Sequence, residues 1–248
     1  MKKYFNINFE FNHQKVDDII FQNIIEKNPG YVCSVDGNNL ATAYSNPDHL
    51  LILNNAIVNN CDSSWTPVII NWIYNTNYSN YCGTDLFIKY VRLKKYRQFF
   101  LGSTPEILKN LQKNLSRIDP AIKTMRFESL PFKKVENFDF KKIAAMINAD
   151  NPEIIWVSLG APKQEKFMSL LLPYLDSGIM FGFGAIFNFY SDMPGLKRSP
   201  NFFVNLKLEW LYRVLQEPKK QIKRFWFFLS LLPKIIYNEI KIKNQNKI

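Results

Sequence analysis

The chain has few of the residues that mark several common functional classes. Its 248 residues include only 9 glycines, 3 cysteines and 2 histidines. With so few glycines it has no GxGxxG fingerprint, which disfavours a dinucleotide oxidoreductase. Cys33, Cys61 and Cys82 are odd in number and lack CxxC spacing, so we expect small buried side chains in a reducing compartment. His13 and His49 form no metal-ligand pattern and are expected at the surface or as helix caps.

Long apolar runs are also absent. No stretch reaches the roughly 18 apolar residues of a transmembrane helix. Residues 1–9 alternate polar and apolar side chains as a strand does, without the apolar core of a signal peptide. We therefore expect the protein to stay in the cytoplasm. Hydrophobic residues make up 47% of the chain and aromatic residues 15%, which predicts a folded globular protein.

The positive charge is concentrated at the C-terminal end. Residues 195–248 contain 12 basic and 3 acidic residues, and so carry +9 of the net charge of +11. Four cations within 219–224 precede the apolar run 225–232. This run is too short to span a bilayer, but beside cations it suits a helix lying on an anionic membrane surface. The alternative is a basic helix that packs its aromatic side chains onto the core. We divide the chain into a core, 1–194, and a basic aromatic appendage, 195–248.

Strand-like and helix-like patterns alternate along the core. This alternation predicts an α/β fold, with a Rossmann-like parallel sheet flanked by helices. The sequence shows no internal repeat and no low-complexity linker. The expected strands cover residues 4–11, 31–35, 56–58, 98–102, 124–127, 153–157 and 179–189. The expected helices cover residues 16–27, part of 40–59, 65–74, 105–114, 141–147 and the segment after residue 162.

The joint between the strand at 153–157 and the next helix has features of a phosphate site. Gly160 permits a tight turn out of the strand, and Pro162 fits the first helical position, where a missing N–H costs nothing. The free N–H groups of the helix start would point at the carboxyl edge of the sheet, where open α/β folds bind ligands. The same turn is also a common structural joint, so the pattern alone leaves both interpretations open.

Four motifs resemble one family. LGAPKQEK at 159–166 resembles a signature of the WecG/TagA/CpsF glycosyltransferases, and the run from LEWLYR to QEP at 208–218 resembles the C-terminal signature of that family. RSP at 198–200 and GTDL at 83–86 fit in the family's order and at about its spacing. The resemblance extends from about residue 31 to about residue 226, which is most of the chain.

The resemblance implies an inverting sugar transfer with a carboxylate as general base. The family has an Asp after a short strand, and the matching residue is Asp62. A carboxylate there could take the proton of an acceptor hydroxyl that attacks the anomeric carbon from behind. Asp62 could also cap a helix starting near Ser64. The family works without a metal, using amides and cations to stabilise the leaving diphosphate, and this chain has no Asp-x-Asp pair. No metal and no other cofactor is therefore expected.

The resemblance also assigns substrate-binding residues. Gln164, in the first turn of the signature helix, is expected to donate to substrate, whereas Glu165 could simply complement the helix dipole. Thr84 and Asp85 could hold the acceptor or the sugar, with a helix cap as the alternative role of Asp85. The full set expected to bind substrate is Ser34, Asp36, Thr84, Asp85, Gly160, Gln164, Glu165, Arg198, Arg213 and Arg224.

Three positions depart from the family pattern. Ser63 replaces the glycine that usually follows the base, and Asp36 places a negative charge in a motif that is usually Thr-x-Asn. Asn80 stands where an arginine is common, so cations of the appendage would have to offset the charge of the leaving group. These departures leave the donor sugar open.

The function implied by the resemblance is transfer of an N-acetylmannosamine-type or other hexose from a UDP-sugar to a polyprenyl-diphosphate-linked sugar. Such a step belongs to bacterial surface polysaccharide or teichoic acid synthesis, with the protein peripheral on the inner face of the cell membrane. Expected partners are the UDP-sugar, the lipid-linked acceptor and an anionic membrane surface, and the chain could form a homo-oligomer. A catalytically silent membrane scaffold is the alternative. A nucleic-acid-binding module is less favoured, because the charges flank a contiguous apolar run instead of alternating with aromatic residues.

Overall fold

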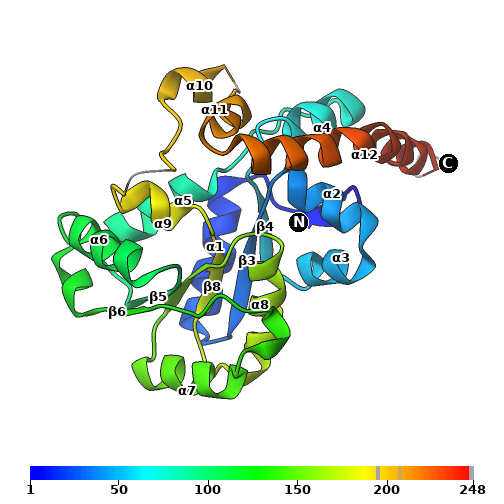
Figure 1. The fold of residues 1–248 in the computed structure, drawn as a ribbon. Coiled ribbons are helices and arrows are strands. Elements are labelled where there is room, and N and C mark those ends of the chain that lie inside the picture. The colour runs from blue at the N-terminus through cyan, green and yellow to red at the C-terminus, as the bar shows by residue number, and fades with distance from the viewer. Residues whose placement is uncertain (194–195, 207, 246–248) are drawn as a thin grey trace.

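The computed structural model describes residues 1–193, 196–206 and 208–245, and these form an α/β structure (Figure 1). Six parallel strands pair in the order β4-β3-β8-β7-β5-β6. The predicted parallel sheet flanked by helices is therefore confirmed. The strands are β3 (Gly30–Val35), β4 (Val58–Cys61), β5 (Gln98–Gly102), β6 (Arg126–Glu128), β7 (Ile154–Ser158) and β8 (Ile179–Gly182).

Helices cover both faces of this sheet. One hydrophobic cluster joins α1, α5, α6 and α9 to the first face, and another joins α2, α3, α7 and α8 to the second. The core helices are α1 (His13–Ile25), α2 (Gly37–Ser45), α3 (Pro47–Asn54), α4 (Thr66–Tyr74), α5 (Gly83–Leu93), α6 (Pro105–Leu115), α7 (Phe140–Asp150), α8 (Lys163–Leu171) and α9 (Ile186–Tyr190). Short 3-10 turns cover Pro120–Thr124, Val135–Asn137 and Leu172–Tyr174.

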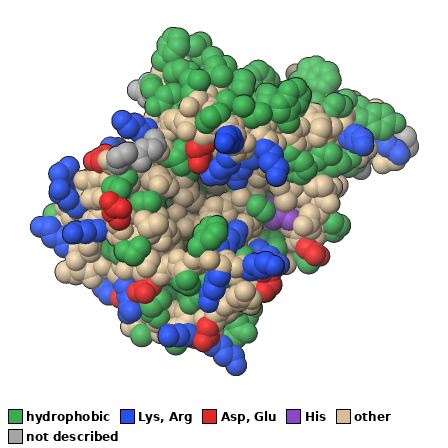
Figure 2. Space-filling model, viewed as in Figure 1, with side chains coloured by type: hydrophobic (Ala, Val, Ile, Leu, Met, Phe, Trp, Pro, Cys, Tyr) green, Lys and Arg blue, Asp and Glu red, His purple; other side chains and the backbone are tan. Residues whose placement is uncertain are grey.

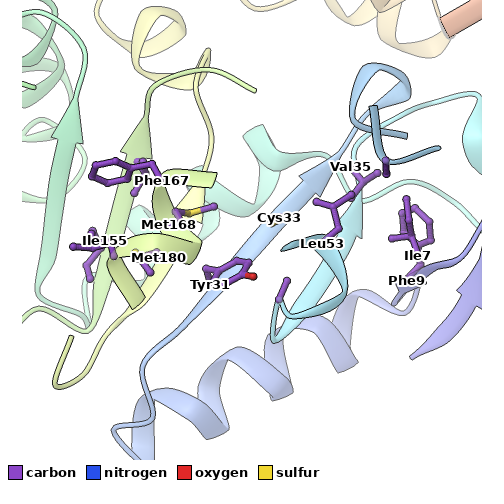
Figure 3. Packing of buried hydrophobic residues seen from close by; sticks show 14 of the residues in the cluster. Ile7, Phe9, Tyr31, Cys33, Val35, Leu53, Ile155, Phe167, Met168 and Met180 are labelled. Carbon is purple, nitrogen blue, oxygen red and sulfur yellow. The ribbon is translucent and has the colours of Figure 1, made fainter. Parts of the chain in front are cut away.

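The central strands are mostly apolar because both of their faces are covered. In β3, Tyr31 and Cys33 point into the cluster on the second face, whereas Val32 points into the cluster on the first. Figure 3 shows Tyr31 and Cys33 on β3, with Met180 of β8 and Leu53 of α3 in the same cluster. Cys33 and Cys61 are buried free thiols, as predicted from the sequence.

Two sequence predictions about strands were wrong. Residues 4–11 do not form one strand. They contain the last residue of β1 (Lys2–Tyr4), a turn and β2 (Ile7–Phe9), and the two strands pair as an antiparallel hairpin. Phe5 and Asn6 adopt φ values of 52° and 62°, and two left-handed residues in sequence make the tight turn that suits a two-residue hairpin. The apolar run 179–189 also divides, because β8 ends at Gly182 and α9 begins at Ile186.

The segment 40–59 contains two helices where the sequence predicted one. Asn46 ends α2 and caps α3, accepting hydrogen bonds from Asp48 N and His49 N. Pro47 then occupies the first turn of α3, where its fixed φ fits and its missing N–H is not needed. The strand expected at 56–58 lies slightly later, as β4.

Three helices follow the core. They are α10 (Asn201–Asn205), α11 (Glu209–Gln216) and the long α12 (Pro218–Gln245). Figure 1 shows α11 above the first part of α12, which runs alongside α2 and α4 toward the C-terminus. The predicted domain boundary at 194/195 falls outside the described residues. Among the described residues, no helix combines the length and apolar character needed to cross a bilayer.

A buried carboxylate fixes the last turns of α12 to the core. Glu239 is only 2% exposed, and it accepts hydrogen bonds from Phe5 N (2.8 Å) and from Tyr74 Oη (2.7 Å). Lys243 also donates to the carbonyl of Ile73. Burial raises the pKa of Glu239. The hairpin, α4 and α12 are therefore held together at one point.

We predict that Glu239→Ala destabilises the protein by about 3 kcal/mol, because two buried donors lose their acceptor. The free energy of unfolding is measured by urea denaturation. Tyr237→Ala, on the same helix at a side chain that is 68% exposed, is the control and should cost less than about 0.5 kcal/mol. Equal losses in the two variants would contradict the anchoring role of Glu239.

Candidate active site

Polar side chains follow β3 and β4 where these strands end. The register pairs Val35 with Cys61, so Asp36 and Asp62 leave the sheet at the same level. Both line a cavity of about 740 Å³ between the carboxyl edge of the sheet and the helices α11 and α12. Open α/β sheets bind ligands at this edge, so this cavity is the candidate active site.

Asp62 is held by two backbone contacts. Its N–H donates to Val35 O (3.1 Å), and its Oδ1 accepts from Gly83 N (2.7 Å), the first residue of α5. The alternative role of Asp62, as the cap of a helix starting near Ser64, was wrong. Ser63 Oγ accepts from the N–H groups of residues 65 and 66 at that helix start, which leaves Asp62 at the N-terminus of α5.

The surroundings of Asp62 raise the pKa of its carboxyl. The largest cause is desolvation by burial, and the negative charge of Asp36 acts in the same direction. The hydrogen bond from Gly83 N and the positive charge of Arg213 act in the opposite direction. A carboxylate with a raised pKa is a stronger base than an exposed one, which is the property that general-base catalysis requires.

Three arginines of the C-terminal segment line the same cavity. Arg198 forms an ion pair with Asp85 of α5. Arg213 lies over the ring of Phe189, 5.0 Å from its centroid, and Arg224 donates to Ala161 O (2.9 Å). Neither Arg213 nor Arg224 forms an ion pair with a residue that the structure describes, so their charge is available to an anionic ligand.

The cavity contains further polar groups. Asp36 caps α2 by accepting from Asn39 N (2.8 Å), and Thr84 Oγ1 lies 2.9 Å from Cys82 Sγ. Asp85 is in the first turn of α5 and not at its cap, which Cys82 occupies. Glu209 accepts from Ser64 Oγ (3.1 Å), and desolvation together with the charge of Asp62 raises the pKa of Glu209.

Seven of the eleven predicted site residues meet in this one cavity. Those that do not line it are Ser34, Gly160, Gln164 and Glu165. Ser34 Oγ accepts from Asn60 Nδ2 (2.8 Å), and a Cβ at Gly83 would come within 2.8 Å of it. The seven residues that line the cavity are Asp36, Asp62, Thr84, Asp85, Arg198, Arg213 and Arg224.

The signature turn is held mainly by the protein itself. Gln164 Oε1 accepts from Gly160 N (3.1 Å), and its Nε2 donates to Gly182 O (2.7 Å) at the end of β8. Pro162 precedes α8 by one residue and does not occupy its first turn. The amide of Gln164 thus joins β7, α8 and β8, while the role as a donor to substrate stays a prediction.

The set of site residues predicted from the sequence leaves out several residues that line the cavity. Cys82 lines the cavity with Glu209 and Trp210, which belong to the C-terminal motif. A second cavity of about 500 Å³ lies where β5 and β7 end, beside Phe132 and Lys163. The glycine turn after β5, at Gly102, resembles the turn after β7 and could have indicated this second cavity. In the described part of the chain, no group of three or more His, Cys, Asp or Glu side chains could hold a metal ion.

Comparison with known proteins identifies the family. The model of the glycosyl transferase WecG/TagA/CpsF family matches residues 4–247. The chain belongs to this family. The enzyme class predicted from the sequence, a glycosyltransferase, is thereby confirmed.

Relatives carry the name N-acetylglucosaminyldiphosphoundecaprenol N-acetyl-beta-D-mannosaminyltransferase. The protein of Bacillus spizizenii is 27% identical over 202 residues, which is 80% of this chain and 74% of the relative. The protein of Bacillus subtilis strain 168 is 27% identical over 172 residues, 68% of this chain and 62% of the relative. The protein of Staphylococcus aureus strain MW2 is 26% identical over 166 residues, which is 66% of this chain and 59% of the relative. The chain thus spans less than two thirds of the length of the latter two.

A buried polar network lies behind the family signature. Glu165 is completely buried and accepts hydrogen bonds on Oε1 from Gln164 Nε2 (3.1 Å) and Asn39 Nδ2 (3.3 Å). Asn39 Oδ1 lies 3.0 Å from His49 Nε2. The expectation that His49 is a surface or capping residue was wrong, since it is 4% exposed and burial lowers its pKa. The network joins α2, α3 and α8.

The carboxyl of Glu165 is more than a complement to the dipole of α8. Desolvation raises its pKa to about 7, and the nearby charge of Asp36 adds to this. Its Oε2 has no hydrogen-bond partner among the described residues. The carboxyl of Glu165 ionises at lower pH in the unfolded chain than in the folded protein. The stability that the protonated carboxyl contributes is therefore fully present below pH 4.5 and is lost as pH rises through about 7.

We predict that Glu165→Gln becomes more stable than the wild type as pH rises, since the amide keeps the accepting oxygen without a charge. The difference in the free energy of unfolding should increase by about 3 kcal/mol between pH 4.5 and pH 8. Urea titrations of both proteins at several pH values measure it. Other carboxyls with raised pKa contribute the same pH dependence to both proteins, so their contributions cancel in the difference. A difference that does not change with pH would show that Glu165 ionises normally in the folded state.

Proposed function

We propose that this chain transfers an N-acetylmannosamine-type or other hexose from a UDP-sugar to a polyprenyl-diphosphate-linked sugar, with inversion at the anomeric carbon and without a metal ion. The observation that carries the proposal is the position of Asp62. It lies in one cavity with Arg213 and Arg224, in a chain whose relatives are named for transfer to N-acetylglucosaminyldiphosphoundecaprenol.

Asp62 is the proposed general base. Its raised pKa favours proton uptake from the acceptor hydroxyl as that oxygen attacks the anomeric carbon. One new bond joins the acceptor oxygen to the sugar, while the bond from the sugar to the UDP oxygen breaks. The proton goes to Asp62, and the electron pair of the broken bond leaves with UDP.

Cations and backbone dipoles are proposed to stabilise the leaving diphosphate. Arg213 and Arg224 carry charge that no ion pair in the described chain neutralises, and Arg224 also contacts Ala161 in the signature turn. Preorganised donors and cations of this kind stabilise charge that develops in a transition state. The substitution of Asn80 for the usual arginine, on the cavity wall, makes the appendage arginines the proposed source of this charge.

The appendage is proposed to contact the inner face of the cell membrane. Figure 2 shows hydrophobic side chains gathered over α10, α11 and α12, with Lys and Arg side chains below them. Exposed aromatic side chains beside cations suit an anionic membrane surface. The exposed apolar residues of this part of the chain include Phe202, Leu206, Leu215, Ile222, Trp226 and Phe227.

Release of UDP from a panel of UDP-sugars, with an N-acetylglucosaminyl diphosphate lipid as acceptor and EDTA present throughout, tests the chemistry. We expect acceptor-dependent turnover that Asp62→Asn lowers by about 10³-fold, because the amide cannot take the proton. Activity of the wild type should fall at acid pH through an apparent pKa above 3.8, the ordinary value for Asp. Folded protein that releases no UDP from any donor would favour a membrane-bound scaffold.

Sedimentation with vesicles tests the membrane contact. Trp226 is 65% exposed. We expect Trp226→Ser to bind anionic vesicles about tenfold more weakly, because the variant lacks the indole ring whose transfer from water into the membrane favours binding. Phe132→Ser, an exposed aromatic outside the appendage, is the control and should bind as the wild type does. Equal affinity of all three proteins would contradict the proposed membrane face.

A further inference from the structure

The walls of the active-site cavity change in character along α12. Gln221 and Arg224 face the cavity near the start of the helix, and Leu232 and Ile236 face it farther along. At 1.5 Å per residue, Arg224 and Ile236 lie about 18 Å apart along the helix. The cavity therefore has a polar end near the arginine and an apolar end beyond it. The apolar end is formed by Ile69, Phe228, Leu229, Leu232 and Ile236.

The first part of α12 presents apolar side chains in two directions. Phe228 is partly buried, lines the cavity and packs against α2, where a Cβ at Gly37 would lie 3.4 Å from its ring. Its neighbour Phe227 is 38% exposed and does not line the cavity. A membrane on the outer surface would cover Phe227, but it would not fill the space beside Phe228 and Leu232.

The apolar end belongs to the same cavity as polar groups that suit the sugar and the diphosphate of a lipid-linked acceptor. Asp62 and Arg224 line the same cavity as Phe228 and Leu232. A lipid-linked sugar combines groups that match this polar and apolar lining, namely a hydroxyl, a diphosphate and a hydrocarbon chain. Mostly apolar pockets with a few convergent polar groups are typical ligand sites.

We infer that the apolar end of the cavity binds the first isoprenoid units of the acceptor lipid, in the space between α4 and α12. This inference rests on the proposed function. The hydrocarbon chain of the acceptor lies beside Phe228, Leu229 and Leu232. The enzyme thus recognises the lipid directly, in addition to meeting it at the membrane.

Soluble acceptor analogues test this inference in the absence of vesicles. The acceptors are N-acetylglucosaminyl diphosphate esters of methanol and of farnesol, used below the concentration at which the farnesyl ester forms micelles. For the wild type we expect kcat/KM to be at least about thirtyfold higher with the farnesyl ester, since each buried methylene adds favourable transfer free energy. In Phe228→Gln the ratio of the two kcat/KM values, farnesyl ester over methyl ester, should fall at least about fivefold.

Phe227→Gln is the matched control, with the same change at the adjacent residue. It should keep the wild-type ratio and bind anionic vesicles more weakly, whereas Phe228→Gln should bind vesicles as the wild type does. Leu232→Gln is a second variant of the apolar end, used if Phe228→Gln does not fold, and its ratio should fall in the same way.

The outcomes separate the inference from the function on which it rests. No turnover with either ester would contradict the proposed function. Turnover with equal kcat/KM for the two esters, or an unchanged ratio in both variants of the apolar end, would overturn the inference and leave the function standing. A Phe228→Gln protein whose sedimentation shows a changed oligomeric state, with an unchanged ratio, would assign this wall to subunit packing and would also overturn it.

Discussion

The parallel direction of the six strands is the constraint on which the rest of the structure depends. Because every strand ends at the same edge, the residues that follow β3, β4, β7 and β8 come together although they are far apart in sequence. Asp36 and Asp62 are level because of the register between β3 and β4. The sheet supplies only one side of the cavity, however. The other side is α11 and α12, and Glu239 holds the far end of α12 on the core.

The fold was largely predictable from hydrophobic patterns. Buried parallel strands are continuous apolar runs, so β3, β5 and β7 were found within a residue or two. The errors arose where one apolar run serves two elements. Residues 179–189 stay apolar while the chain passes from β8 to α9, and only the backbone turn between them distinguishes strand from helix. The hairpin turn at Phe5 was hidden because that residue lacks the usual glycine or asparagine signal.

The candidate site was predictable in its members more than in its arrangement. Motif resemblance led to Asp62 and to the three arginines, all of which line the cavity. The signature at 159–166 also led to Gln164 and Glu165, whose side chains contact the protein interior. A sequence motif records that residues occur together, whether they contact substrate or hold the turn behind it. Only the hydrogen bonds from these side chains to α2 and β8 separate the two roles.

The hydrogen bond from Arg224 to Ala161 gives the protein a form of thermodynamic linkage. Arg224 belongs to the same helix as the outward-facing Trp226, and Ala161 lies in the turn that joins β7 to α8. A ligand that strengthens or breaks this bond changes the free energy of holding the first part of α12 against the core. By reciprocity, a contact that fixes α12 from outside and any interaction that depends on this bond change each other's free energy by the same amount. One bond thus couples the outer surface of the appendage to the interior edge of the sheet.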